Sequence, residues 1–505
     1  MSFETNKFSV VRKKRLERSQ FNVECNIDID VEIDKILSVC HTAVIENSEI
    51  LNGVVNYSGI VDLCIVYSTI DGEVGTVSAS CPFIGKVEDG SISVSDKIAV
   101  NVEVEDYQID AVTNANIKIS CNCQQSALLI QNKDVDFVAS GDEGLCFKED
   151  EIYISTLIGE AKSIFNVESQ TSIKEPIRKV ILTDSQVSIK TVDSGINFVS
   201  VGGEVVTRIL YLTEKDRFET SYLTESFKEE VELNGVTKDS LSEASAQVKK
   251  ALVRCELVEN EKGVDIKMVV PIEVKVVAFE EKQQSVVKDI YSTEGELSIV
   301  TESFEMTKQY HNENFDAKID GSLTLDDDKP RVDKILFVGG SNLAITNAYL
   351  SGGEVFVEGI AKTNVIYLND ETNSLNSVIM EVPFVVSDKT TIECENSSII
   401  AQASIVDVDV VVKKGREFYF DAKLKINAEI YCEMVGAVIS KIDMTEKYAE
   451  KDCAIEVVFG QAGQTAWDIA KQVKVREETI FMQNPTVNFP LDKDENIVIF
   501  YQKKN

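Results

Sequence analysis

Histidine is almost missing from this chain of 505 residues, which contains only His41 and His311. A Ser-His-Asp triad or a histidine-rich metal site would have to draw on two residues that lie far apart in the sequence. His311 stands in the polar stretch QYHNEN, which we interpret as an exposed loop. We therefore expect no catalytic histidine and no metal site, and we expect that the protein is not an enzyme.

Basic residues are also few, because 51 Lys and Arg stand against 85 Asp and Glu and leave a net charge of -34. Binding to nucleic acid or to anionic lipid needs clustered cations that release counterions, so we expect neither as a partner. One basic cluster does occur, and we interpret it as a solvated strand face. It comprises Arg12, Lys13, Lys14, Arg15 and Arg18.

No stretch of about 18 uninterrupted apolar residues is present, so we expect no membrane span. The first ten residues, MSFETNKFSV, lack the apolar run and the small-residue cleavage site of an export signal, which predicts a cytoplasmic location. The eleven cysteines are scattered singly through the chain. We expect them to be reduced thiols.

Signals for a bound cofactor are missing as well. The Gly-Gly pairs lack the Lys-Ser or Lys-Thr that follows in a phosphate-binding loop. Cys121 and Cys123 alternate with polar residues along one strand face, so we expect small core residues there and not metal ligands. Asp326, Asp327 and Asp328 form the densest acidic run, which we interpret as a solvated linker. No cofactor is expected.

What the sequence does contain is an internal repeat. The nonapeptides GIVDLCIVY, GEVVTRILY and GIAKTNVIY all begin with a glycine and end with a tyrosine. These landmarks are Gly59 and Tyr67, Gly203 and Tyr211, and Gly359 and Tyr367. A lysine followed by an apolar pair precedes each nonapeptide, at Lys35, Lys179 and Lys334, and the motif FNVE opens the first two copies.

Within each copy the apolar residues recur with a period of two, which predicts half-buried strands. The segment 420–430, FDAKLKINAEI, shows this alternation over its whole length. Turns are expected at Asp71-Gly72, Gly202-Gly203 and Gly352-Gly353. Such closely spaced strands favour an antiparallel sandwich or barrel over a parallel sheet. The fold class is therefore predicted as mainly β, with three tandem sandwich-like repeats at 1–147, 148–296 and 297–447. We expect the recurring glycine to permit a bend or a close backbone approach, and the tyrosine to cap the strand with its ring buried and its hydroxyl hydrogen-bonded.

After about residue 450 the pattern changes to that of a small separate module at 452–505. Strands are predicted at 455–461 and 495–501, and helices at 463–473 and 475–484. Thr465 is a suitable N-cap for the first helix, and Asp468 stands at the capping-box position three residues later.

The segment GQTAWDIA, followed by Asn484-Pro485 and a last apolar strand, resembles the LysM domain, a β-α-α-β module. The matching positions are Gly463, Thr465, Trp467, Ile469, Ala470, Asn484 and Pro485. Three tandem repeats ahead of such a module resemble the SPOCS-domain spore-coat proteins of endospore-forming bacteria.

This resemblance implies a non-enzymatic scaffold that acts in the mother cell, at the forespore surface and coat. It implies binding of the coat basement-layer ATPase SpoIVA through the LysM-like tail, together with contacts to other coat proteins. The binding residues in the tail would then be Gly463, Thr465, Trp467, Asp468, Ile469, Asn484 and Pro485. We expect Trp467 either to anchor the partner or to fill the module's own core. The alternative is a protein of the cell wall or spore cortex whose tail binds a glycan, peptidoglycan.

Overall fold

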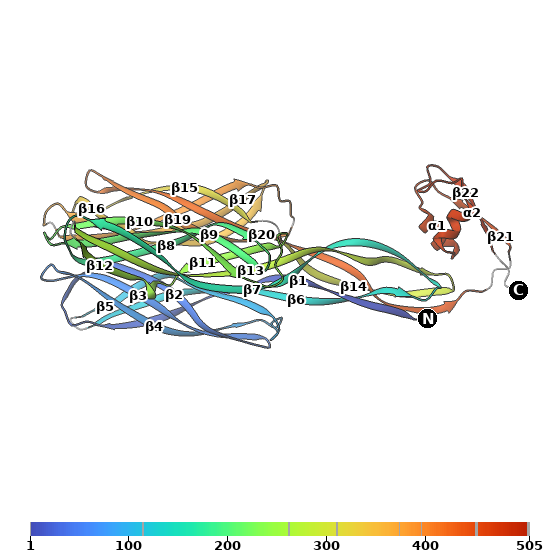
Figure 1. Cartoon of the computed structure of the whole chain (residues 1–505), viewed down its shortest axis with the longest axis horizontal. Coiled ribbons are helices and arrows are strands. Elements are labelled where there is room, and N and C mark those ends of the chain that lie inside the picture. Colours follow the sequence, from blue (N-terminus) through green and yellow to red (C-terminus); the bar gives the residue numbers. More distant parts are fainter. Residues whose placement is uncertain are drawn as a thin grey trace.

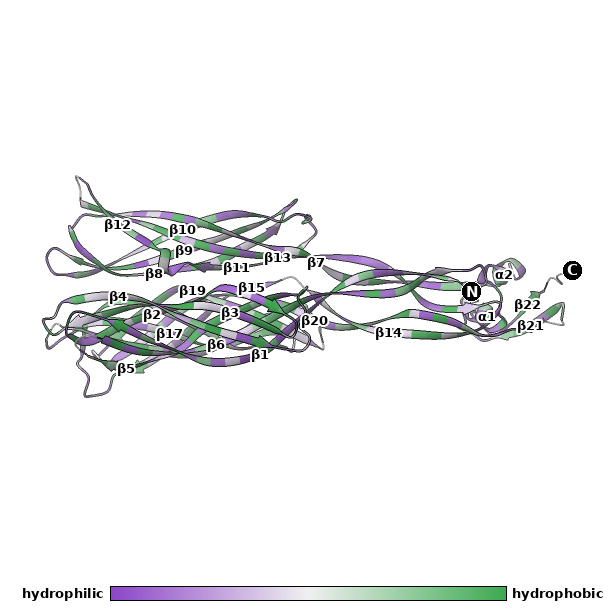
Figure 2. Ribbon diagram, turned by 90° about the horizontal axis from the view of Figure 1, so that it is seen from below, coloured by the Kyte–Doolittle hydropathy of each residue, from purple (hydrophilic) through white to green (hydrophobic). Residues whose placement is uncertain are grey.

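The computed structural model describes residues 2–113, 116–260, 263–309, 312–372, 374–394, 396–449 and 453–501. The chain is mainly β, as predicted, with long antiparallel strands and two short helices in the described parts. Along these strands hydrophobic and hydrophilic residues alternate (Figure 2). The predicted exposed loop around His311 lies partly outside the described residues.

The strands fall into three consecutive sets. The first set is β1 (Phe3–Asp28), β2 (Ile33–Leu51), β3 (Val54–Thr69), β4 (Val74–Glu88), β5 (Lys97–Val112) and β6 (Asn116–Gly141). The second is β7 (Leu145–Ile173), β8 (Ile177–Ser194), β9 (Phe198–Thr213), β10 (Phe218–Glu232), β11 (Leu241–Val248), the 3-10 helix η1 (Lys250–Leu252), β12 (Arg254–Asn260) and β13 (Gly263–Ser292). The third is β14 (Gly295–Gln309), β15 (Glu313–Thr324), β16 (Val332–Ser351), β17 (Glu354–Asn369), β18 (Leu375–Lys389), β19 (Ser397–Lys413) and β20 (Glu417–Lys447).

Each set builds one sandwich with the same topology. In the first, the sheet β1-β6-β5 packs on the sheet β2-β3-β4, and alternate residues of both sheets fill one core. The second set repeats this with β8-β9-β10 facing a sheet built on β13, and the third with β16-β17-β18 facing a sheet built on β20. We call these the first, second and third copies.

The recurring glycines lie in the middle strand of each three-stranded sheet. A Cβ atom added at Gly59 would come within 2.2 Å of the Val44 carbonyl oxygen and 2.6 Å of the Phe83 ring. Gly203 and Gly359 meet the rings of Phe227 and Phe384 in the same way. Only glycine fits such an approach of ring and neighbouring strand. The rings of the three landmark tyrosines at 67, 211 and 367 are buried in the same strands.

The three copies surround a common centre instead of forming a row (Figure 1). The edge strand β4 contacts β8 of the second copy, β10 contacts β16 of the third, and β18 contacts β2 of the first, which closes a ring. Equivalent residues from each copy form the apolar core inside this ring, among them Leu37, Ile181 and Leu336, and Val66, Leu210 and Ile366. The three-stranded sheets are therefore covered on both faces near this core.

The landmark lysines close the same ring, each reaching the neighbouring copy. Lys35 Nζ donates to Asn376 Oδ1 at 3.2 Å, and Lys179 Nζ donates to the Val74 carbonyl oxygen at 3.3 Å. Lys334 Nζ lies 3.9 Å from Glu219 Oε2. The repeated sequence motif thus supplies contacts between the copies as well as structure within them.

The long outer strands continue beyond the sandwiches into a stalk (Figure 1). It consists of three two-stranded arms: the start of β1 with the end of β6, the start of β7 with the end of β13, and β14 with the end of β20. Their inward residues form a further core shared by all copies, including Phe8, Ile154 and Phe304.

The basic cluster lies at the base of this stalk, and its interpretation as a solvated strand face is wrong for Lys13. The Lys13 side chain is fully buried, and its Nζ donates to Glu243 Oε1 of the second copy at 2.6 Å. The Lys13 backbone N–H donates to Thr307 Oγ1 of the third copy at 2.8 Å. Arg12 pairs with Glu305 at 2.5 Å, and Arg15 donates to the Ile399 carbonyl oxygen. At Lys13 the other copies cover the strand and exclude solvent, whereas Arg15 and Arg18 are exposed, as the interpretation requires.

Two further expectations are corrected. Gly202 and Gly203 do not form a turn, because they lie inside β9, where the close contact with Phe227 needs a glycine. Four cysteines are not reduced: Cys25 is bonded to Cys81, and Cys394 to Cys432. The two cysteines of the first pair are 56 positions apart in the sequence, and those of the second pair are 38 apart. Only the folded structure brings the partners together, so the sequence alone does not show the pairing. The other seven cysteines are free.

Lys13→Met should destabilise the protein strongly, because it leaves the Glu243 carboxylate buried without its partner. The expected loss is about 3–5 kcal/mol of unfolding free energy. Lys7→Met removes an exposed lysine of the same strand, which pairs with Asp134 of β6, and it should destabilise the protein far less. Chemical denaturation curves of both variants would check this, and equal midpoints would contradict it.

A second prediction concerns pH. Burial, followed by the nearby charge of Glu243, raises the pKa of Glu429 to about 8, against the opposing effect of Lys13. A carboxyl whose folded pKa is raised stabilises the fold at low pH and loses that contribution as the pH rises from about 4.5 to 8.

Glu429→Gln should therefore leave the melting temperature nearly unchanged at pH 5 and raise it by a few degrees at pH 9. Melting curves across that range are the measurement. A Gln variant that follows the wild type at every pH would show that Glu429 does not titrate there.

Candidate partner-binding site in the tail module

The tail module, residues 453–501, has the predicted order of elements. It consists of β21 (Ile455–Gly460), α1 (Ala466–Val473), α2 (Glu477–Gln483) and β22 (Glu495–Phe500), and the two strands pair antiparallel. Figure 1 shows it at the end of the molecule opposite the sandwiches. The module therefore lies at the far end of the stalk, away from the three sandwiches.

The predicted capping box is present at the start of α1. Thr465 Oγ1 accepts from the Asp468 backbone N–H, and the Asp468 carboxylate accepts from the Thr465 backbone N–H at 2.9 Å. The hydrogen bonds that the Asp468 carboxylate accepts from the Thr465 backbone N–H and hydroxyl lower its pKa. The box fixes the direction in which the helix leaves the loop, and Gly463 precedes it at a φ of +91°, which favours glycine.

Asn484 and Ile469 hold the module together from inside. The Asn484 side chain donates to the Ile480 and Val498 carbonyl oxygens and accepts from the Val498 N–H. It thereby joins the end of α2 to the outer edge of β22. Ile469 is fully buried, whereas Pro485 is exposed. Of the predicted binding residues, Gly463, Asp468 and Pro485 are the ones open to solvent.

Trp467 is buried, with 5% of its surface exposed, and contacts a different part of the chain. Its ring packs edge-on against Tyr291 at the stalk tip, with centroids 4.8 Å apart. Its Nε1 donates to Asp289 Oδ2 at 2.9 Å. As an anchor for another protein, Trp467 would first have to leave this contact.

Exposed apolar residues form a surface that the sequence reasoning missed. On the face of β21 and β22 turned away from the helices lie Ile455, Val457, Phe459 and Phe500, and Ile455 is paired with Phe500 across the strands. Phe481 and Met482 of α2 are exposed as well. The signal was available in IEVVFG, where apolar residues occupy both faces of a two-stranded sheet although only one face can meet the helices.

Residues considered for chemistry in the three copies do not converge on a reactive site. Cys121 and Cys123 are fully buried, and burial raises the pKa of their thiols to about 11 and about 12. Burial lowers the pKa of His41 to about 4, and its ring packs against Tyr107. Over the described ranges, no group of three His, Cys, Asp or Glu side chains is placed to hold a metal ion.

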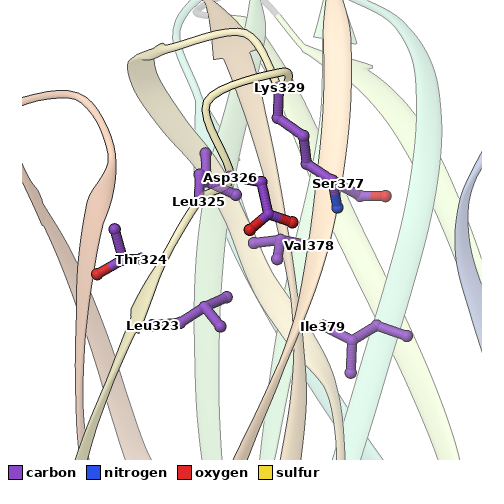
Figure 3. Close-up of a pocket in the computed structure, with 8 residues that line it drawn as sticks. All are labelled: Leu323, Thr324, Leu325, Asp326, Lys329, Ser377, Val378 and Ile379. Atoms are coloured by element: carbon purple, nitrogen blue, oxygen red, sulfur yellow. The ribbon is translucent and has the colours of Figure 1, made fainter.

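A surface hollow of about 400 Å³ lies at the acidic run, between the turn after β15 and strand β18 (Figure 3). Asp326 and Lys329 supply its charged side chains, and Ser377 lies beside them. The run is exposed, as the linker interpretation requires.

Comparison with known protein families finds a match for part of the first copy. Residues 32–112 match the family described as SipL, SPOCS domain, which covers β2 to β5 and less than a fifth of the chain. Over this segment the chain is similar to the SPOCS domain, which connects it with sporulation and the spore coat. No curated protein and no solved structure matches the chain. No helix in the described parts is long and apolar enough to cross a membrane.

Thr465→Ala should weaken the module by about 1 kcal/mol, because it removes the N-cap of α1. Thr465→Ser keeps the hydroxyl and should restore most of the stability. Trp467 is the only tryptophan in the chain, so its emission during thermal unfolding reports on the module. Equal transitions for the Ala and Ser variants would contradict a role for the cap.

Proposed function

We propose that this protein is a non-enzymatic scaffold of the spore coat, which acts in the mother cell and joins coat proteins to the forespore surface. The observation that carries the proposal is the match of residues 32–112 to the SPOCS domain, in a chain that repeats the same sandwich twice more. The order of three copies and a β-α-α-β tail resembles the clostridial coat protein SipL. That the protein is no enzyme is proposed because its sequence has only two histidines and no phosphate-binding loop.

The tail module is proposed to be LysM-like and to bind the basement-layer ATPase SpoIVA. Its outer face supports this, since Ile455, Val457, Phe459 and Phe500 expose apolar area in a module of about fifty residues. Contiguous exposed apolar area of this kind is typical of protein interfaces, where aromatic anchors contribute most of the binding energy. The three copies then remain available for other coat proteins.

Phe459→Glu should abolish recovery of SpoIVA with the tagged full-length protein, because it places a charge in the centre of the proposed interface. Phe459 is 61% exposed, so the module should still fold, as Trp467 emission would verify. Ile84→Glu is the matched control, since Ile84 is 85% exposed and lies on the first copy.

Undiminished recovery with Phe459→Glu would contradict the assignment of this face. Sedimentation of the same proteins with purified peptidoglycan tests the alternative. Strong retention that Phe459→Glu does not affect would favour a glycan-binding tail.

A further inference from the structure

The tip of the stalk and the α1 face of the tail module fit together around one carboxylate. Asp289 lies near the end of β13 and accepts from Trp467 Nε1 and from Lys471 Nζ, the latter at 2.6 and 2.8 Å. Trp467 and Lys471 are four residues apart, so they project from the same side of α1. A single stalk residue thereby holds two side chains of the module.

Apolar and backbone contacts surround this carboxylate. The Tyr291 hydroxyl donates to the Val475 carbonyl oxygen at 2.6 Å, and its ring belongs to the same core as Trp467 and Ile469. Cys146, at the start of β7, packs against that core as well. The stalk tip therefore completes the hydrophobic core of the module.

Two cations of the module reach further stalk residues at the rim. Arg476 donates to the Glu143 carbonyl oxygen, and Lys474 Nζ lies 3.6 Å from Glu296 Oε1. The contacts thus reach the loop between the first and second copies, strand β13, and β14 of the third copy. Contacts on several sides fix an orientation, which one ion pair alone would not.

The charge state of Asp289 suits this contact. Burial raises the pKa of its carboxyl, but the hydrogen bonds from Lys471 and Trp467 outweigh burial and bring the pKa below its usual value. Asp289 is therefore ionised at neutral pH and can attract the Lys471 ammonium group.

We propose that the stalk tip is an intramolecular docking site for the tail module, and that the clasp of Asp289 with Trp467 and Lys471 keeps the α1 face closed to other ligands. In the docked state the module presents the outer face of β21 and β22, and a ligand that needs Trp467 must displace the stalk. The clasp goes beyond the proposed function, because it forms within one chain whatever the partner is.

The single tryptophan gives a direct readout on the full-length protein without any partner. Asp289→Lys should release the module, shift the Trp467 emission to longer wavelength and strengthen its quenching by acrylamide. Lys471→Glu changes the other side of the clasp at a half-exposed position and should have the same effect. Combining both substitutions restores an ion pair of reversed polarity and should recover part of the wild-type emission, because a lysine at position 289 cannot accept from Trp467 Nε1.

Asp150→Lys is the matched control, since Asp150 is a stalk carboxylate that pairs with Lys288 and should leave the emission unchanged. Unchanged emission and quenching in both single variants would overturn the clasp. Scattering profiles should show a more extended and variable tail position in the released variants only. A docked signal that is lost on dilution would also overturn the proposal, because the module would then dock on a second copy of the chain.

Discussion

An ammonium group without access to solvent lies where the three copies meet, and the rest of the architecture depends on how its charge is satisfied. An ionised group in such surroundings is tolerated only with a partner charge and further polar or aromatic contacts. For the Lys13 ammonium group these come from Glu243 and Phe279 of the second copy and from Tyr431 of the third, while the Lys13 backbone N–H donates to Thr307 of the third. The first copy therefore cannot bury this strand face alone, and the three sandwiches form one body because each completes the surroundings of another.

The three copies contribute equivalent apolar residues to the ring that they form, but they differ in the polar residues that contact neighbouring copies. Leu37, Ile181 and Leu336 make the central core nearly symmetric, but the sixth position of the repeated nonapeptide is Cys64, Arg208 or Asn364. Arg208 faces Asp184 at 3.9 Å, and Asn364 donates to the Leu37 carbonyl oxygen of the first copy. Three identical subunits would place the same side chain in all these positions. Gene-internal duplication permits this asymmetry, and apolar area then provides the adhesion while the unlike polar groups specify the arrangement.

Much of each sandwich could be predicted from the sequence, because a period of two and a recurring Gly and Tyr are local properties of a strand. The capping box at Thr465 was equally accessible, since it involves residues three apart. The burial of Lys13 could not be predicted. Alternation of apolar and polar residues shows that a strand has two faces, but it does not show whether another part of the protein covers the polar face. The pairing of Cys25 with Cys81 depends in the same way on the packing of two sheets. Asp289 is one of 85 acidic residues, and only the tertiary structure distinguishes it from the others.

The stalk holds the proposed binding face of the tail module away from the sandwiches (Figure 1). The net charge of -34 is spread over a chain whose sandwiches form most of its mass, and an acidic surface repels acidic partners at close range. From Lys13 to the start of β1 the stalk extends about 30 Å at roughly 3.3 Å per residue, several times the Debye length of about 8 Å at physiological salt. A partner at the tail is therefore screened from most of this charge. A spacer has this effect only if the module stays at its tip. The contact of Asp289 with Trp467 and Lys471 supplies the restraint that such a spacer needs.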